Sequence, residues 1–259
     1  MKILLALAAI LGIHAAPIGN TASPDLIEKG IFASSDYRVD IRAGYEGDFV
    51  TDGRMNQFEQ GTGRVDCYQQ NTNSGTFTLN FVDRLDIYGV FGSSDTKAEW
   101  RISTGDEIHR LEMKTQQNFL WAVGARAILY EWCKISLGMG GRYSECDYAP
   151  EHFFSDGIAE PVLGTFCHWR QWQVNLDFSY KIKIFTPYIG VKYSDEKTHL
   201  GNFTVPIASD GSGSNSFQNR DPVGLYLGCA LSNGHYFMVN LEGRLIDEEA
   251  VTISAELRF

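Results

Sequence analysis

Hydrophobic and polar residues alternate along most of the chain. The C-terminus shows this most plainly, because Val251, Ile253, Ala255, Leu257 and Phe259 would share one face of a strand while the residues between them are small or polar. The same period of two recurs in residues 37–46, 76–81, 119–129, 171–180, 223–231 and 237–245. Such alternation predicts β-strands with one apolar and one polar face.

Polar segments separate these runs. The sequence Ser-Asn-Gly at residues 232–234 is typical of a hairpin turn. Longer polar segments are expected to form loops at residues 53–66, 71–75, 147–164 and 202–221. Counting the runs predicts about 12 strands, within a range of roughly 10 to 16, because a membrane-spanning strand takes ~9–11 residues plus a connection.

Two folds share this alternation. A soluble β-sandwich turns its apolar faces toward a core, whereas a membrane barrel turns them outward to lipid and its polar faces inward to water. The barrel is favoured because the polar faces carry many charged residues and because aromatic residues cluster at the ends of the runs. These aromatic residues are Tyr37, Tyr45, Trp132, Trp172 and Tyr180. We therefore predict an all-β protein, a transmembrane antiparallel β-barrel.

The N-terminus has the layout of a cleavable export signal. Lys2 precedes an apolar run from Ile3 to Ile13, and Ala15 and Ala16 follow as small residues. We therefore divide the chain into a signal peptide at residues 1–15, an N-terminal segment at residues 16–35 and a barrel at residues 36–259. The last strand is expected to pair with the first one, near residues 37–45, because closure removes both sheet edges.

Composition narrows the functional classes. The chain has 32 Asp and Glu against 22 Lys and Arg among 259 residues, a net charge of −10, and no cluster of cations. This balance excludes a nucleic-acid partner, since phosphate neutralisation needs clustered Lys and Arg. Beyond residue 16 no apolar stretch approaches the ~18–20 residues of a membrane helix, which excludes a helical membrane protein.

Charged residues on the polar faces are candidates for a pore lining. They are Arg38, Asp40, Arg42, Arg126, Asp177, Lys181, Lys192, Glu242 and Arg244. Such residues cost little around water and shape the field of a pore. The histidines match neither a barrel lipase nor a zinc motif, and Gly211–Ser214 lacks the context of a nucleophile elbow. We therefore expect no enzyme activity, no catalytic residue, no metal and no cofactor.

Blocks of sequence in order along the chain carry a further signal. They are Pro17–Asn20, Ser23–Pro24, Arg42–Val50, Asp83–Tyr88, Trp121–Ala127, Phe185–Lys192 and Arg244–Phe259. These blocks resemble the chlamydial major outer membrane protein family of porins, of which this chain would be a short member. The resemblance implies a barrel through which small solutes diffuse, often as a homotrimer, and relatives that stiffen the envelope through intermolecular disulfides.

The five cysteines are Cys67, Cys133, Cys146, Cys167 and Cys229. An odd count in an exported chain leaves at least one thiol free or paired between chains. The resemblance makes Cys133 the first disulfide candidate, and Cys67, Cys146 and Cys167 are further candidates because they lie near expected loops. Alternatively, Cys133 and Cys229 are small apolar wall residues within strand-like runs.

The expected function is passive diffusion of small solutes through a water-filled porin in the bacterial outer membrane. The alternative is a non-conducting structural or adhesive barrel. Strand number separates them, because about 8 strands leave a lumen filled by side chains and about 12 leave room for water. Expected partners are the lipid bilayer, the barrel-assembly machinery, for which Phe259 is the C-terminal signal, and cysteine-rich envelope proteins.

Overall fold

The computed structural model describes residues 17, 19–27, 30, 39–57, 65–104, 107–202 and 215–259. The expected signal peptide, Tyr37 and Arg38 lie outside the described residues. Within the described part of the chain, no helix is both long enough and apolar enough to cross a membrane.

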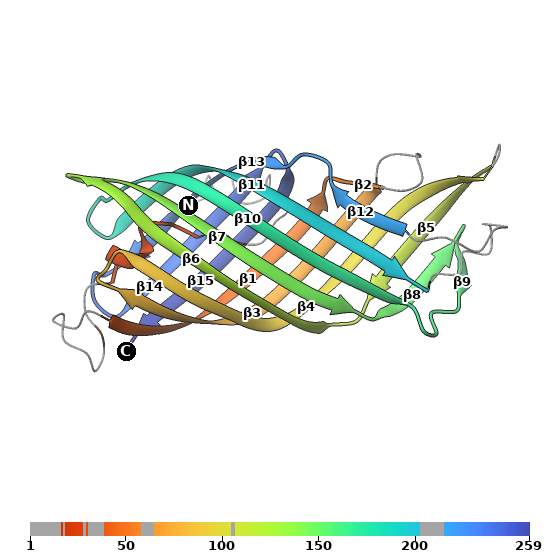
Figure 1. Cartoon of the computed structure of the whole chain (residues 1–259), viewed down its shortest axis with the longest axis horizontal. Coiled ribbons are helices and arrows are strands. Elements are labelled where there is room, and N and C mark those ends of the chain that lie inside the picture. Colours follow the sequence, from red (N-terminus) through yellow and green to blue (C-terminus); the bar gives the residue numbers. More distant parts are fainter. Residues whose placement is uncertain are drawn as a thin grey trace, which may run out of the picture.

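Ten strands form a closed antiparallel barrel (Figure 1). They are β1 (Val39–Gly53), β3 (Val65–Phe81), β4 (Leu85–Thr104), β6 (Asn118–Trp132), β7 (Ile135–Tyr148), β10 (Phe166–Tyr180), β11 (Phe185–Gly201), β13 (Val223–Ser232), β14 (Phe237–Leu245) and β15 (Glu248–Arg258). Around the ring they follow the order β3–β1–β15–β14–β13–β11–β10–β7–β6–β4, and pairing of β4 with β3 closes it. The prediction of a transmembrane-type β-barrel is confirmed.

Closure occurs where the sequence predicts it. β1 pairs with β15, with Ala43 opposite Leu257. The backbone N–H of Phe259 donates a hydrogen bond to the Ile41 carbonyl at 3.0 Å. The backbone N–H and C=O groups at both edges of the sheet thereby find hydrogen-bond partners, as a sheet surrounded by lipid requires.

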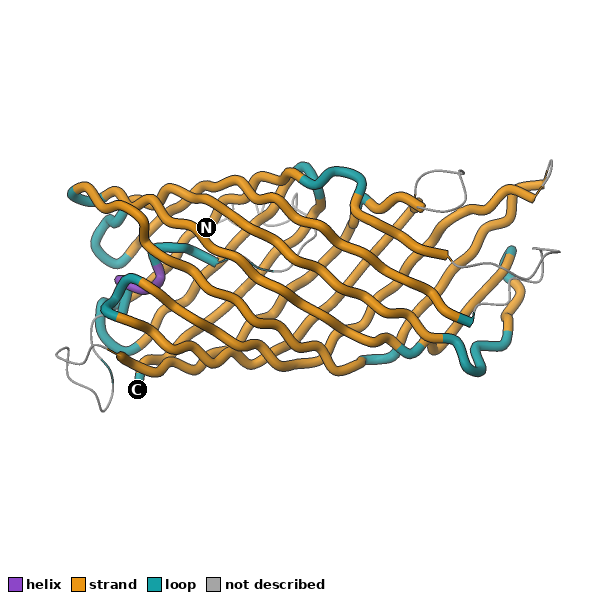
Figure 2. The backbone as a smooth tube through the Cα atoms, in the orientation of Figure 1, coloured by secondary structure: helices purple, strands orange, loops and turns teal. Residues whose placement is uncertain are grey.

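The two ends of the barrel differ. Short connections lie at one end, here called the turn end, at residues 82–84, 133–134, 181–184 and 233–236. At the opposite end, the loop end, five short strands extend the sheet: β2 (Met55–Gln57), β5 (Glu107–Thr115), β8 (Pro150–Ser155), β9 (Ile158–Glu160) and β12 (Asn215–Asn219). The C-terminus and the single-turn 3-10 helix η1 (Ser23–Asp25) lie at the turn end (Figure 2).

The barrel strands number ten, within the predicted range but below the expected 12. The reason is strand length: β4 has 20 residues and β3 and β11 have 17 each, more than lipid requires. The expected loop at residues 71–75 is wrong, because these residues lie inside β3 and pair with both β1 and β4. The expected loop at residues 147–164 contains the β8–β9 hairpin.

β10 shows how the outer surface is built. From Trp172 to Tyr180 the outward residues are apolar and exposed, and the residues between them are polar and buried. Nine residues cover about 27 Å along a strand, or roughly 20 Å of membrane normal at a tilt of 35–45°. Residues Phe185–Tyr193 of β11 and Ile135–Tyr143 of β7 form matching stretches. We call this ring of outward apolar positions the lipid band.

Above the lipid band, toward the loop end, the polarity of both faces reverses. On β10 the outward residues become His168 and Arg170, while the inward residues become Cys167 and Trp169, which are 0% and 2% exposed. Inward residues from several strands meet there in one apolar cluster, the loop-end core. Its members are Met55, Val65, Tyr68, Ala98, Trp100, Ile102, Leu111, Met113, Leu120, Cys146, Tyr148, Phe153, Cys167, Trp169, Leu200 and Phe217. The same strands therefore form a membrane barrel below and a core-packed sheet above.

This division predicts how substitutions on one strand face depend on depth. Leu176→Lys places a cation in the lipid band and should cost about 2–4 kcal/mol of folding free energy, whereas Phe166→Lys, outward on the same strand beyond the band, should cost about 0–1 kcal/mol. Both side chains are comparably exposed, at 39% and 45%. Denaturant titrations in lipid vesicles measure the difference. Equal losses for the two variants would place the membrane elsewhere.

Candidate functional site

The lumen holds most of the charged residues that the sequence singles out. Seven of the nine candidates are buried on the inner face: Asp40, Arg42, Arg126, Asp177, Lys192, Glu242 and Arg244. Arg38 lies outside the described residues. Lys181 lies not on a strand wall but in the turn after β10, where its Nζ is 3.1 Å from Asp25 Oδ2.

Further charged residues, beyond the nine candidates, share the lumen. They are Glu46, Asp48, Asp86, Arg142, Glu196, Asp247, Glu248, Glu256 and Arg258. Residues separated by an even number of positions lie on the same face of a strand, and this spacing identifies most of them. Glu46 lies four residues beyond Arg42, and Glu256 lies two residues before Arg258. Asp247 carries no such signal, because it lies in a turn between β14 and β15.

Two ion pairs span the lumen. Arg126 Nη2 on β6 lies 2.7 Å from Glu256 Oε1 on β15, and Arg142 Nη1 on β7 lies 2.9 Å from Glu46 Oε1 on β1. Three strands separate the members of each pair around the ring, so these contacts cross the interior. Both pairs consist of nearly buried side chains, and loss of one partner in such a pair costs about 3–5 kcal/mol.

Other pairs line the wall between neighbouring or next-nearest strands. Arg244 Nη2 lies 2.6 Å from Asp48 Oδ1, and Arg258 Nη2 lies 2.8 Å from Asp40 Oδ2. Lys192 Nζ lies 2.8 Å from Asp247 Oδ2 and also pairs with Glu248. These contacts satisfy cations that would otherwise be buried without a counter-charge.

Carboxylates outnumber cations among the buried charged side chains that the structure describes. Ten are carboxylates: Asp40, Glu46, Asp48, Asp86, Asp177, Glu196, Glu242, Asp247, Glu248 and Glu256. Six are cations: Arg42, Arg126, Arg142, Lys192, Arg244 and Arg258. Among these described side chains, carboxylates therefore exceed cations by four.

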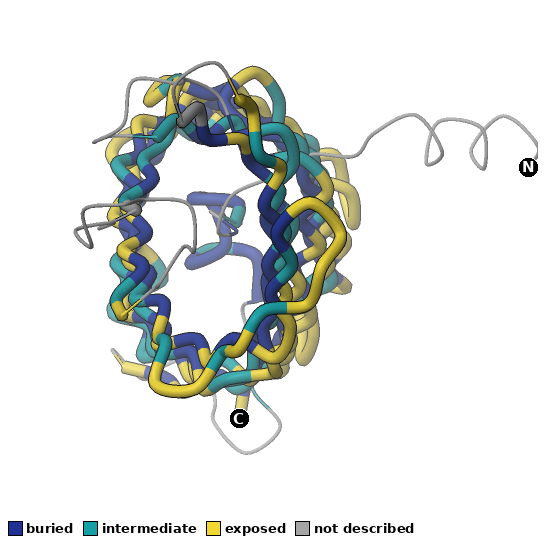
Figure 3. Tube along the Cα trace, turned by 90° about the vertical axis from the view of Figure 1, so that its right-hand side faces the viewer, coloured by how far each residue is buried: buried dark blue, intermediate teal, exposed yellow. Residues whose placement is uncertain are grey.

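Residues 19–27 of the N-terminal segment lie inside the lumen at the turn end, which the sequence did not predict. Figure 3 shows the segment as a buried trace inside the ring. Thr21 is its main anchor: the Thr21 backbone N–H donates to Asp177 Oδ2 at 3.2 Å and its hydroxyl donates to Asp177 Oδ1. On β7, a Cβ at Gly138 would collide with Thr21, so only glycine permits this approach.

Contacts from several other strands hold the same segment. Arg42 donates through Nη1 to the Ser23 carbonyl and through Nη2 to the Pro24 carbonyl, both at 2.9 Å. Leu26 and Ile27 pack against Ala230 and Met238 on the inner wall. The segment is therefore bound by both polar and apolar contacts and narrows the turn end.

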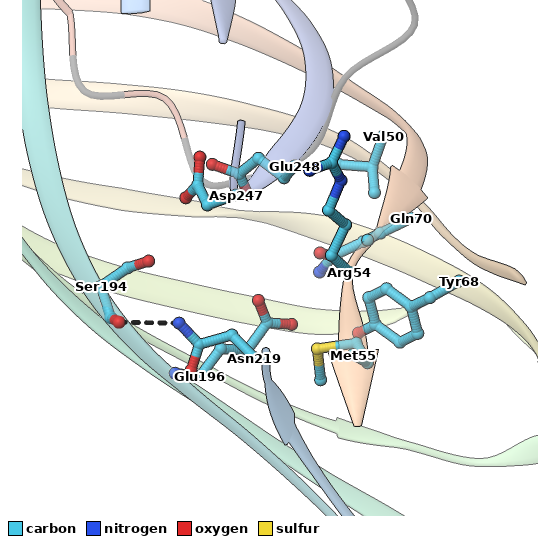
Figure 4. Close-up of a pocket in the computed structure, with 11 residues that line it drawn as sticks. Val50, Arg54, Met55, Tyr68, Gln70, Ser194, Glu196, Asn219, Asp247 and Glu248 are labelled. Carbon is cyan, nitrogen blue, oxygen red and sulfur yellow. Dashed lines mark hydrogen bonds between the residues drawn. The ribbon is translucent and has the colours of Figure 1, made fainter. Parts of the chain in front are cut away.

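Three small cavities lie between the described side chains of the lumen. A cavity of about 20 Å³ lies beside Arg126 and Glu256, and another of about 10 Å³ lies beside Arg142. A third, also about 10 Å³, lies near the loop end beside Arg54, Glu196 and Glu248 (Figure 4). Each has room for about one or two water molecules.

The cysteines occupy different environments, and all five are free thiols. Cys133 is exposed in the two-residue turn between β6 and β7 rather than in a strand. Cys146 and Cys167 lie in strands within the loop-end core rather than in loops, and Cys67 and Cys229 are half-buried in strands. Burial raises the pKa of the Cys146 thiol to about 12 and raises that of Cys167 as well.

No group of three or more His, Cys, Asp or Glu side chains among the described residues is arranged to hold a metal ion. His109 Nδ1 lies 2.7 Å from Asp156 Oδ2, and His168 Nδ1 lies 2.6 Å from Asp147 Oδ1. Both pairs lie at the loop end beyond the lipid band, outside the lumen.

Thiol reactivity should follow these environments. In the folded protein at pH 8, an alkylating reagent should modify Cys133 first, because its side chain is exposed, and leave Cys146 and Cys167 unmodified until the barrel unfolds. Mass spectrometry of timed digests measures each rate. The Cys133→Ser variant provides the control for the fast phase, and modification of Cys146 as fast as Cys133 would contradict the packing of the loop-end core.

Comparison with known proteins adds the family context. No family model matches the chain. The major outer membrane porin of Chlamydia trachomatis serovar D is 24% identical, with 98% of this chain and 97% of the porin aligned, and that of Chlamydia muridarum is 25% identical over 97% of both. The first alignment runs over 383 positions, so these porins contain segments that this shorter chain lacks.

A solved outer membrane channel from Pseudomonas putida F1 matches with a TM-score of 0.44 and 9% identity, covering 88% of this chain and 99% of the channel. The sequence alignments extend over nearly the whole chain and confirm the resemblance deduced from its sequence blocks. Along nearly its whole length, this chain is therefore similar in sequence to the chlamydial major outer membrane porins.

Proposed function

We propose that this chain is an outer-membrane porin with a narrow, cation-preferring lumen for passive diffusion of small solutes. The observation that carries the proposal is the closed barrel with an apolar outer band and an ionised inner wall. The outer-membrane location agrees with the names of the relatives, which are outer membrane porins. Short turns of such barrels face the periplasm, so the loop end would face outward.

The proposed passage is restricted at three heights. The N-terminal segment occupies the turn end, the two cross-lumen ion pairs span the middle and the loop-end core fills the outer end. Ions and small solutes therefore pass only as these groups move or hydrate. We infer no enzymatic role, and the homotrimer, the barrel-assembly machinery and the cysteine-rich partners remain parts of the proposal that follow from the family resemblance.

The same filling favours a second candidate, a non-conducting structural or adhesive barrel. Its support is the set of small cavities between the cross-lumen pairs. Planar bilayers separate the two functions. A porin gives ohmic conductance steps and swelling of liposomes, whereas a structural barrel that migrates as a folded species on gels gives neither.

The charge balance predicts cation selectivity. In a salt gradient the reversal potential should indicate a preference for K⁺ over Cl⁻, and it should move toward zero in the variant carrying Glu196→Gln and Glu242→Gln. Glutamine keeps an acceptor oxygen for Trp169 Nε1 and for the Tyr188 hydroxyl, which donate to these carboxylates. Glu107→Gln with Glu151→Gln, at exposed positions, is the control and should leave the potential unchanged. Anion preference in the unaltered protein would refute the charge argument.

The N-terminal segment should limit the current. Refolded protein that begins at residue 31 lacks residues 19–27 and should show larger unit conductance than protein that begins at residue 16, because the contacts to Asp177 and Arg42 are gone. Single-channel recordings in planar bilayers give both values. Identical conductance for two proteins that fold equally well would mean that the segment does not obstruct the passage.

A further inference from the structure

A cleft of about 410 Å³ lies on the outer surface at the loop end, far larger than the cavities of the lumen. β10, β11 and β12 form it. Its polar lining consists of His168, Arg170, Lys197, His199, Ser216 and Gln218, with Thr198 and Phe217 completing it. Nothing in the proposed conduction pathway uses this cleft, which opens to the side of the barrel.

Two cationic side chains, and beside them two histidines, face one another across the floor of the cleft. Arg170 on β10 is directly opposite Lys197 on β11, and His168 is directly opposite His199. Like charges at directly opposed positions of antiparallel strands destabilise a sheet. On its other side Arg170 is directly opposite Glu145 of β7, which offsets part of this repulsion, and an anion bound between Arg170 and Lys197 would relieve the rest.

Nearby carboxylates neutralise only part of this charge. Asp195 Oδ2 accepts from Lys197 Nζ at 3.0 Å, and Asp147 Oδ1 lies 2.6 Å from His168 Nδ1. Glu145 Oε1 lies 4.0 Å from His168 Nε2. Within the described part of the chain, Arg170 makes no ion pair within 4.0 Å, so its exposed guanidinium is available to a ligand.

The height of the cleft indicates where the ligand comes from. Arg170 lies two residues beyond Trp172, and Lys197, directly opposite Arg170, lies four residues beyond Tyr193. The rings of Trp172 and Tyr193 pack with centroids 5.5 Å apart at the upper edge of the lipid band. Two residues are about 6.7 Å along a strand. Aromatic residues of a barrel mark the membrane interface, so the next outward positions lie at the level of the lipid headgroups.

We propose that this cleft binds the phosphate of an anionic glycolipid in the outer leaflet. The planar guanidinium of Arg170 can contact two phosphate oxygens, and Lys197 adds a point charge. The Ser216 hydroxyl, 3.1 Å from His199 Nδ1, offers a further hydrogen bond. The acyl chains of the same lipid would lie below, along Trp172 and the lipid band. The proposal does not depend on conduction.

Lipid binding to the full-length protein, folded in detergent, tests the proposal. The probes are bisphosphorylated lipid A, the same lipid after phosphatase treatment, and inorganic phosphate. The variant carries Arg170→Gln and Lys197→Gln. The control carries Arg101→Gln and Lys114→Gln, which remove the same charge from exposed outward positions on β4 and β5. Native mass spectrometry counts bound lipid.

Bisphosphorylated lipid A should bind the unaltered protein and the control alike, and bind the Arg170/Lys197 variant at least about tenfold more weakly, as expected for loss of charge-assisted contacts. The phosphatase-treated lipid should bind the unaltered protein as weakly as the variant binds the intact lipid. Equal binding of both lipids, or equal losses in variant and control, overturns the site. Displacement of the lipid by inorganic phosphate at equal concentration would overturn the assignment to a lipid-borne phosphate.

Discussion

Inside lipid, every backbone N–H and C=O must find a partner within the protein, and the rest of this structure depends on that requirement. This requirement forces the sheet to close into a ring. A ring of ten strands has an interior that short side chains on the wall would not fill. The protein fills that interior with long charged side chains that meet across it, such as Arg126 with Glu256, and with its own N-terminal segment. The charged side chains and the N-terminal residues inside the lumen are therefore a consequence of closing the sheet so that neither edge is exposed to lipid.

The strands continue beyond the lipid, where water surrounds them on the outside. There the hydrophobic effect drives apolar side chains inward again, and the loop-end core forms around Trp100 and Trp169. The competing sandwich interpretation of the alternating sequence therefore describes one part of the molecule correctly. A single strand such as β10 follows both rules in turn, with the change at Trp172.

The barrel could be predicted from the sequence because a period of two survives this change. The apolar face switches from the outside to the inside of the barrel, but the alternation itself continues along β10 through Arg170 and Trp172 without interruption. The sequence overestimates the number of barrel strands for the same reason, because the strands continue beyond the lipid and each uses more residues than a membrane span requires. The polar residues 71–75 looked like a loop because strand propensity is low there, yet pairing on both sides keeps them in β3.

Alternation along the strands predicts which charged residues face the lumen, but it does not predict their ion-pair partners. Glu46 and Arg142 are 96 positions apart and meet only because the ring places β1 and β7 on opposite sides. The entry of Thr21 into the lumen also depends on Gly138, a small residue whose role is visible only when the segment is in place. Such contacts depend on closure of the whole ring, which no local pattern encodes.

The reversal of polarity along strands such as β10 also sets how deep the barrel sits. A downward displacement by two residues would drag Arg170 and Lys197 into hydrocarbon, and an upward one would lift Trp172 and Tyr193 out of the interface into water. Both displacements are opposed, by the cost of immersing charge and by the cost of wetting apolar surface. The free energy of the protein in the membrane is therefore lowest at one depth, and the strands themselves keep the barrel at that depth.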